Sequence, residues 1–243
     1  MPIVARQCRS VLLLLQQPAL EPLVRPQLPA NCQIVLPGEQ PPAIDFHCPL
    51  MSVPAVLATT LQTLPAEVPY LRAAPAAVQA WRERLGPGGL RVGVAWSGNP
   101  ANSNDGNRSM GVETFRAIAT EGCRFFTVQP HTREADRQPM AQWQQVADVG
   151  RTLRDFADTA ALMEALDLVI TVDTSVAHLA GAMGRPVWIL VPYLPDWRWM
   201  LERTDSPWYP SARLFRQPAP GDWAPVLQQV RSELAKLAAT APA

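Results

Sequence analysis

The densest group of potentially reactive side chains lies in residues 171–181, where an apolar strand pattern ends in Asp173, Thr174 and Ser175 and a helical pattern follows at once. Asp173 or Thr174 is a natural N-cap, and the free first-turn amides and the dipole of a helix favour an anion. His178 comes four residues after Thr174, and helical side chains lean toward the N-terminus, so we expect its imidazole beside the same anion. The stretch predicts a phosphate site, with the Thr174 and Ser175 hydroxyls as further donors. The alternative is that Asp173 and Thr174 only cap the helix and His178 bonds a neighbouring loop.

A second candidate is the loop over residues 97–109, which follows a strand pattern ending at Trp96. The loop lacks apolar periodicity and is long for a connection inside a compact domain, and such loops are usually functional. Arg108 offers a planar fork of donors that suits a phosphate, and Gly98 would let the backbone approach a ligand. The alternative is a solvated flexible loop. The residues that we expect near a ligand at this strand end are Trp96, Ser97, Gly98, Asn99 and Arg108.

An aromatic group follows in residues 196–210, which hold three of the eight tryptophans. Flat aromatic walls suit sugar rings or a nucleobase. Trp197, next to Asp196, is the candidate for contact with a ligand, whereas Trp199 and Trp208 more simply attach the last crossover to the core.

A carboxylate and an imidazole stand two residues apart in the first third of the chain, at Asp45 and His47. Both would lie on one face of an extended segment. This spacing suits a general base with its partner, although so short a pattern often arises by chance.

These groups are positioned by a regular alternation of elements after residue 90. Strands are expected over residues 91–96, 124–128, 145–149, 168–172 and 187–191, and helices over residues 112–120, 158–166, 175–183 and 223–239. Near-continuous apolar strands separated by helices are typical of a parallel sheet covered on both faces. Ligands of such sheets bind beyond the carboxyl ends of the strands, where Gln129 joins the groups around Ser97, Asp173 and Asp196.

The first third is rich in proline and predicts short elements. Strands are expected over residues 10–16 and 32–36, with a possible third over 44–46, and helices after Pro18 and over 75–85. The glycines and proline of residues 86–89 combine a helix stop with a flexible joint. We therefore predict a shortened N-terminal α/β domain over residues 1–86 and a Rossmann-like domain over residues 87–243.

Composition and missing motifs exclude several classes of function. The 243 residues carry 21 basic and 21 acidic side chains, so no long-range field gathers nucleic acid. No apolar run approaches the roughly 20 residues that cross a bilayer, and the run over residues 11–15 is too short for a signal peptide. Phosphate-loop, dinucleotide, nucleophile-elbow and HExxH patterns are missing from the sequence. The four cysteines have neither metal-ligand nor redox spacing, which favours free thiols and a cytoplasmic protein.

Several motifs together resemble a known family. They are residues 94–100 (VAWSGNP), 107–109 (NRS), 155–160 (DFADTA), 173–181 (DTSVAHLAG), 196–199 (DWRW) and 206–210 (SPWYP). The set extends over nearly the whole chain and resembles the glycosyltransferase domain that follows tetratricopeptide repeats in many bacterial proteins, related to family nine, the ADP-heptose transferases. The repeats and the family's opening strand with its Gly-Asp-rich loop have no counterpart here, so the chain is expected to begin at the second strand.

The resemblance implies a GT-B architecture, in which two Rossmann-like domains face a cleft and the C-terminal one holds a nucleotide-diphosphate sugar. The residues that match the family's diphosphate-binding helix start are Asp173, Thr174, Ser175 and His178. Ser97 and Arg108 match the loop that meets the same phosphates, although the family's lysine is replaced there. An inverting transfer without metal or other cofactor is implied, to a glycan, a lipid-linked sugar or a protein. The family's catalytic base near the opening strand has no counterpart, so Asp45 and His47 are stand-in candidates by position alone.

Two other functions stay open. A truncated or decayed transferase would bind a nucleotide or sugar without transferring anything. A sugar-nucleotide epimerase on the same architecture would release free nucleoside diphosphate in the absence of an acceptor.

Overall fold

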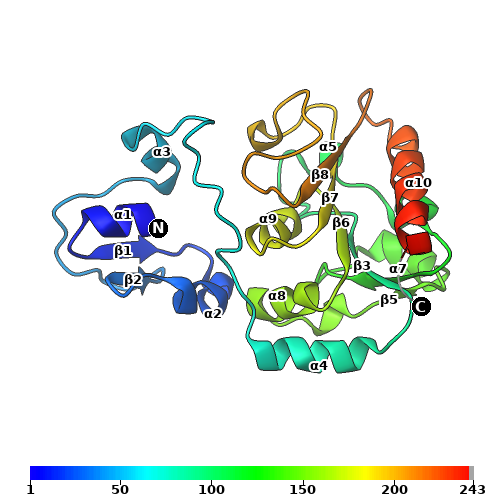
Figure 1. Ribbon diagram of the computed structural model, residues 1–243, viewed down its shortest axis with the longest axis horizontal. Coiled ribbons are helices and arrows are strands. Elements are labelled where there is room, and N and C mark those ends of the chain that lie inside the picture. Colours follow the sequence, from blue (N-terminus) through cyan, green and yellow to red (C-terminus); the bar gives the residue numbers. More distant parts are fainter. Residues whose placement is uncertain (241–243) are drawn as a thin grey trace.

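Two parallel sheets organise the chain in the computed structural model, which describes residues 1–240 (Figure 1). The smaller sheet pairs β1 (Val11–Leu14) with β2 (Cys32–Val35). The larger sheet has the order β5-β4-β3-β6-β7-β8, with every neighbouring pair parallel. Its strands are β3 (Leu90–Ala95), β4 (Cys123–Thr127), β5 (Val146–Ala147), β6 (Leu168–Val172), β7 (Val187–Val191) and β8 (Ala212–Arg216). The predicted α/β class with parallel sheets is confirmed.

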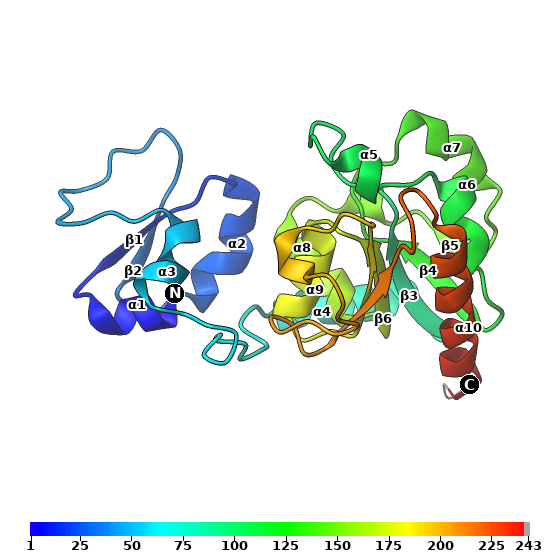
Figure 2. The same cartoon turned by 90° about the horizontal axis from the view of Figure 1, so that it is seen from above.

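Helices cover both faces of the larger sheet, as Figure 2 shows from above. One layer contains α4 (Pro75–Leu85), α8 (Phe156–Glu164) and α9 (Ser175–Ala182). The opposite layer contains α6 (Val112–Phe115), α7 (Glu134–Ala141) and α10 (Ala224–Thr240). A parallel sheet needs this double cover because its strands are apolar on both faces.

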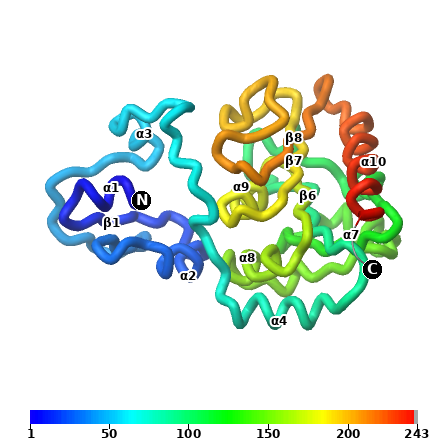
Figure 3. The backbone as a smooth tube through the Cα atoms, viewed as in Figure 1, coloured from blue at the N-terminus to red at the C-terminus, as the bar shows by residue number. Residues whose placement is uncertain are grey.

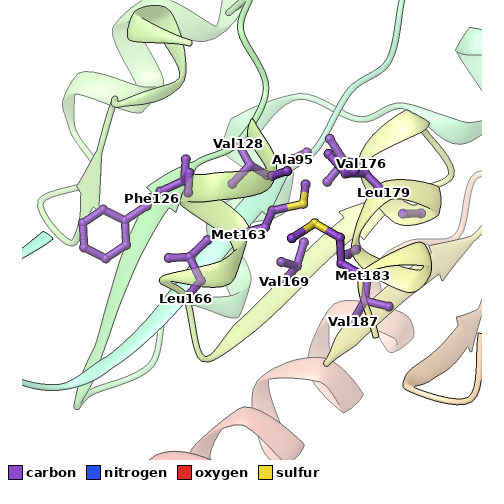
Figure 4. Packing of buried hydrophobic residues seen from close by; sticks show 14 of the residues in the cluster. Ala95, Phe126, Val128, Met163, Leu166, Val169, Val176, Leu179, Met183 and Val187 are labelled. Atoms are coloured by element: carbon purple, nitrogen blue, oxygen red, sulfur yellow. The ribbon is translucent and has the colours of Figure 1, made fainter. Parts of the chain in front are cut away.

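Alternate strand residues enter different cores. Val92, Val94 and Trp96 pack in the cluster on the α10 side, whereas Ala95 and Val169 pack in the cluster beneath α8 and α9. Figure 4 shows the second cluster, in which the methionines of α8 and of the turn after α9 lie between the strand residues. Since successive side chains of a strand point to opposite faces, the register of each strand decides which loop residues reach solvent.

The N-terminal part contributes only short elements around β1 and β2. They are α1 (Pro2–Gln7), α2 (Glu21–Val24) and α3 (Val53–Val56), with 3₁₀ turns at Pro18–Leu20, Arg25–Gln27 and Leu50–Ser52. Leu23 of α2 is buried in the same core cluster as the residues of α8. The helix expected after Pro18 is therefore a series of single turns, and the smaller sheet is attached to the larger body through α2.

The connection from α3 to α4 passes between the two parts, as the tube in Figure 3 shows. The amides of Tyr70 and Leu71 both donate to the carbonyl of Ala182 at the end of α9, at 3.0 and 3.3 Å. Helix α4 then packs against α8, with Trp81 and Leu85 buried there. The boundary between residues 86 and 87 stays a prediction, and the structure adds that α4, which precedes it, lies on the layer of the larger sheet.

Several predicted elements have different lengths or are missing. Residues 44–46 form no strand: the whole stretch from residue 41 to residue 50 is exposed, and the small sheet consists of β1 and β2 alone. The helix expected over residues 112–120 ends as α6 at Phe115 with a 3₁₀ turn behind it, and the strand expected over 145–149 is only β5. Five elements were not predicted: α1, α3, α5 (Asp105–Arg108), α7 and β8.

No helix within residues 1–240 combines the length and the apolar character that a membrane crossing requires. The four cysteines are unpaired, and those at positions 8 and 48 are exposed.

Candidate functional site

The turn between β6 and α9 has the cap that the sequence predicts. Thr174 is the N-cap, and its hydroxyl accepts a hydrogen bond from the amide of Val176 at 3.3 Å. The same hydroxyl lies 3.3 Å from that of Thr171, which fixes its direction. Ser175, the first residue of α9, stays exposed. The positive end of α9 therefore opens to solvent beside a free hydroxyl.

Asp173 and Arg108 come together at this turn from two different strand ends. Arg108 donates through Nη1 to the backbone carbonyl of Asp173 at 2.8 Å. Asp173 is only 6 % exposed, directly before the cap. A guanidinium thus lies against the start of α9, where an anion would also gain from the helix dipole.

Residues 97–109 form a closed loop with internal structure instead of a flexible connection. The amide of Met110 donates to the carbonyl of Trp96 at 3.0 Å, which closes the neck of the loop. Inside it, the amide of Gly98 donates to the hydroxyl of Ser109 at 2.9 Å. A Cβ added to Gly98 would lie 2.8 Å from Arg108 Nη2, so the glycine is needed for the guanidinium to lie there. Asn99 accepts from the amide of Ala101 at the exposed tip.

Two residues expected near a ligand, Trp96 and Gln129, instead use their side chains for hydrogen bonds within the protein. The Trp96 side chain is fully buried, and its indole N–H donates to Asp136 at 2.8 Å. The Gln129 side-chain carbonyl accepts from the amides of Trp96 and Ser97, at 3.0 and 3.4 Å. Both side chains therefore hold the backbone in place where the loop begins. Ser97 follows them at the loop's base and is itself buried.

His178 lies in an aromatic pocket on α9. Its ring stacks on Trp199 with centroids 5.1 Å apart, and its Nδ1 is 3.1 Å from the hydroxyl of Tyr209. Tyr209 approaches so closely because residue 181 is glycine; a Cβ there would lie 2.3 Å from the tyrosine ring. Burial lowers the pKa of His178, which nearby Asp173 and Asp196 partly oppose, while Arg198 and Arg108 lower it further. The imidazole is therefore neutral at pH 7 and offers one donor and one acceptor.

This shifted histidine predicts a loss of stability on mild acidification. Between the lowered pKa and the ordinary value near 6.5, the unfolded chain binds a proton that the folded chain does not. The stabilisation present above pH 6.5 is therefore lost as the pH falls through that window. We expect a lower Tm at pH 5.5 than at pH 7.5, and a smaller difference in His178→Gln. The exposed His131, changed to Gln, is the control and should leave the difference intact.

The expectations for the tryptophans after β7 hold for Trp199 but not for Trp208, which is half-buried and belongs to neither core cluster. Trp199 is buried against His178, in agreement with the core role preferred for it. Trp197 is 57 % exposed and meets Trp208 edge-on at 5.6 Å. Arg198 pairs with Asp196 at 3.0 Å and lies 4.6 Å from the centre of the Trp197 ring. Trp197 therefore presents an aromatic face with a cation beside it.

Asp45 and His47 lie in an exposed loop, not on a strand as the expectation of one shared face required. The loop between β2 and α3 runs along the outer edge of the N-terminal part in both views (Figures 1 and 2). No hydrogen bond or ion pair within residues 1–240 links either side chain to the group around Asp173. The structure does not bring these two residues into the site.

Two residues at the site, Asp105 and Arg133, were not predicted, and Ser109 was noted only as part of the motif over residues 107–109. Asp105 is buried and accepts from Ser109 at 2.7 Å and from Arg133 at 2.5 Å. The available signal was a carboxylate within the polar loop, where Asp105 begins α5, but its partner Arg133 stands 28 residues later, at the N-cap position of α7. In residues 1–240 no group of three or more His, Cys, Asp or Glu could hold a metal ion.

The region from residue 113 to residue 191, which begins within α6 and ends with β7, matches one family model. The model is that of glycosyltransferase family 9 (heptosyltransferase). The matched region includes the start of α9 and its histidine, while the loop over residues 97–109 precedes it. Within it lie the predicted site residues Gln129, Asp173, Thr174, Ser175 and His178.

The chain is also similar to individual proteins. Protein FlbA of Caulobacter vibrioides (strain ATCC 19089 / CIP 103742 / CB 15) is 30% identical over 195 residues, which cover 76% of this chain and 32% of FlbA. Escherichia coli ADP-heptose lps heptosyltransferase II superposes with a TM-score of 0.52 at 18% identity, over 73% of this chain and 56% of that one. A family 9 glycosyl transferase from Veillonella parvula DSM 2008 has a TM-score of 0.49 at 15% identity, over 70% and 54%.

The structural similarity establishes the fold and leaves the activity to be proposed. The superposition on the heptosyltransferase confirms the predicted GT-B-like α/β class. The chain spans about a third of the length of the curated relative and just over half of that solved structure.

Proposed function

We propose that this chain is a glycosyltransferase that binds the diphosphate of a nucleotide-diphosphate sugar at the start of α9. The observation that carries the proposal is the Arg108 guanidinium held 2.8 Å from the Asp173 carbonyl, beside the open end of α9. Phosphate oxygens would receive hydrogen bonds from the first-turn amides, the Ser175 hydroxyl and the N–H groups on Nη2 of Arg108. The family 9 match of this region supports a nucleotide-sugar donor.

The proposed reaction is an inverting transfer. The acceptor hydroxyl oxygen attacks the anomeric carbon, the bond from that carbon to the diphosphate oxygen breaks, and the hydroxyl proton passes to a base. The dipole of α9 and Arg108 would stabilise the departing diphosphate without a bound metal or other cofactor. Asp45 and His47, exposed in the loop between β2 and α3, are the candidate bases on the N-terminal side.

We also propose that the exposed Trp197 face contacts the sugar or the base, since an aromatic ring beside Arg198 suits either. The acceptor is a glycan, a lipid-linked sugar or a protein. A cytoplasmic location would keep exposed thiols such as Cys8 reduced.

A thermal-shift titration against ADP, UDP, GDP, CMP and TDP tests the donor site. At 100 times Kd, binding should add about 2.7 kcal/mol to stability and raise Tm by about 5–10 °C for a chain of this size. Arg108→Ala and His178→Ala should lose the shift. Arg231→Ala, which removes an exposed arginine from α10, is the matched control and should keep it.

If none of the five nucleotides raises Tm, the proposed donor site is contradicted. A shift that survives in Arg108→Ala and His178→Ala would move the site elsewhere. Binding without transfer to any acceptor would favour a binding module, and release of nucleoside diphosphate without an acceptor would favour an epimerase.

A further inference from the structure

Asp105 is a buried carboxylate at the centre of the loop over residues 97–109. It is 6 % exposed, although a buried carboxylate is unfavourable unless it is paired and hydrogen-bonded. One oxygen accepts from the Ser109 hydroxyl at 2.7 Å and lies 3.9 Å from Nε of Arg108. The other oxygen accepts from Arg133 at 2.5 Å. One carboxylate is thus shared between two guanidinium groups.

Arg133 reaches this carboxylate from outside the loop, from the N-cap position of α7. Its Nη2 donates to Asp105, to the Gly98 carbonyl at 3.1 Å and to the Ser109 hydroxyl at 3.4 Å. Gly98 and Ser109 lie at opposite ends of the loop. A single guanidinium nitrogen therefore ties both ends of the loop to the start of α7.

The side chain of Arg108 is held by contacts with the same loop and with the turn before α9. Its Nη2 lies against Gly98, its Nε faces Asp105, and its Nη1 donates to the Asp173 carbonyl at 2.8 Å. Within residues 1–240, Nε of Arg108 is buried without a hydrogen-bond partner. Of the five N–H groups of the guanidinium, the two on Nη2 form no hydrogen bond within the described residues and are not buried, so these are the ones left for a ligand.

We infer that Asp105 and Arg133 form a clasp that holds this loop against the start of α9 and positions Arg108 for an anion there. They are positioning residues, since neither needs to touch the anion. The inference rests on the proposed function for the identity of the anion, a nucleoside diphosphate. A purely structural ion pair would also close the loop, but it would not couple to Arg108 in binding.

The clasp is tested first without any ligand, by hydrogen exchange in Asp105→Asn and Arg133→Gln. Both variants should speed exchange across residues 97–109 by about tenfold or more, while the amides of β3 and β6 keep their protection. Asp222→Asn, which changes an exposed carboxylate before α10, is the matched control. Unchanged exchange in the loop would overturn the clasp. Arg133→Gln serves alone if Asp105→Asn does not fold, because Arg133 is partly exposed.

A double-mutant cycle tests the positioning role. The quantity measured is the affinity for ADP, or for another nucleoside diphosphate if that is the one the parent chain binds. Asp105→Asn and Arg108→Gln should each weaken binding by about tenfold, and the double variant should bind no more weakly than Arg108→Gln. Independent, multiplying losses or an unchanged affinity in Asp105→Asn would overturn the role while the proposed function stands. If the parent chain binds no nucleoside diphosphate, the proposed function and the positioning role fail together, and exchange still decides on the clasp.

Discussion

Replacing Asp136 by alanine should lower the free energy of unfolding by about 3–5 kcal/mol, the largest loss that we expect from a single side chain. Asp136 is 4 % exposed, and its carboxylate accepts from the Trp96 indole and from the Val112 amide, each at 2.8 Å. Alanine would leave both donors buried without a partner. Urea unfolding monitored by tryptophan fluorescence measures the loss.

Two further variants separate hydrogen bonding from charge. Asp136→Asn keeps one acceptor oxygen, so it should lose less than Asp136→Ala. Asp222→Ala removes an exposed carboxylate and should change stability by less than about 0.5 kcal/mol. A loss below about 1 kcal/mol in Asp136→Ala would mean that water replaces the carboxylate and that these contacts do not hold the loop neck.

A methyl group at Gly150 should have the second-largest effect, a destabilisation of about 3 kcal/mol. The added Cβ would lie 2.1 Å from the Gln129 carbonyl oxygen and 2.9 Å from the Thr127 hydroxyl. Backbone at the end of β4 would have to move, and with it the Gln129 side chain that accepts from the Trp96 amide. We therefore expect Gly150→Ala to lower both Tm and the affinity for the nucleotide.

Gly106→Ala is the matched control for this substitution. An added Cβ at Gly106 meets no atom within 4 Å, and the residue lies in α5. Alanine there should be neutral or stabilising by up to about 1 kcal/mol, because it restricts the unfolded chain. If Gly150→Ala is as stable as Gly106→Ala, the close approach of the Gln129 carbonyl is not a constraint in solution.

Local patterns predicted the elements around the site almost to the residue. Strand β6 (Leu168–Val172) and strand β7 (Val187–Val191) are continuous apolar runs, and the Asp-Thr-Ser sequence between β6 and α9 contains its own cap. These signals depend on neighbours in sequence, which is why they could be read without a structure.

Contacts between distant segments could not be read in the same way. Asp105 meets Arg133 only because α7 packs beside the loop, and α7 itself was hidden by its polar sequence and by Pro139. The buried position of Trp96 could have been predicted from the alternation of strand residues. This residue continues the alternation of Val92 and Val94, which places its side chain in the same core and away from the ligand edge.

The narrow neck of the loop over residues 97–109 has a consequence for how this edge can change in evolution. Its ends are joined by the Trp96 carbonyl and the Met110 amide, and Asp136 holds the residues on both sides. An insertion at the exposed tip, residues 99–103, would leave the sheet untouched, and doubling the length of a loop costs only about 0.6 kcal/mol. Natural variation can therefore alter recognition at this edge almost independently of folding.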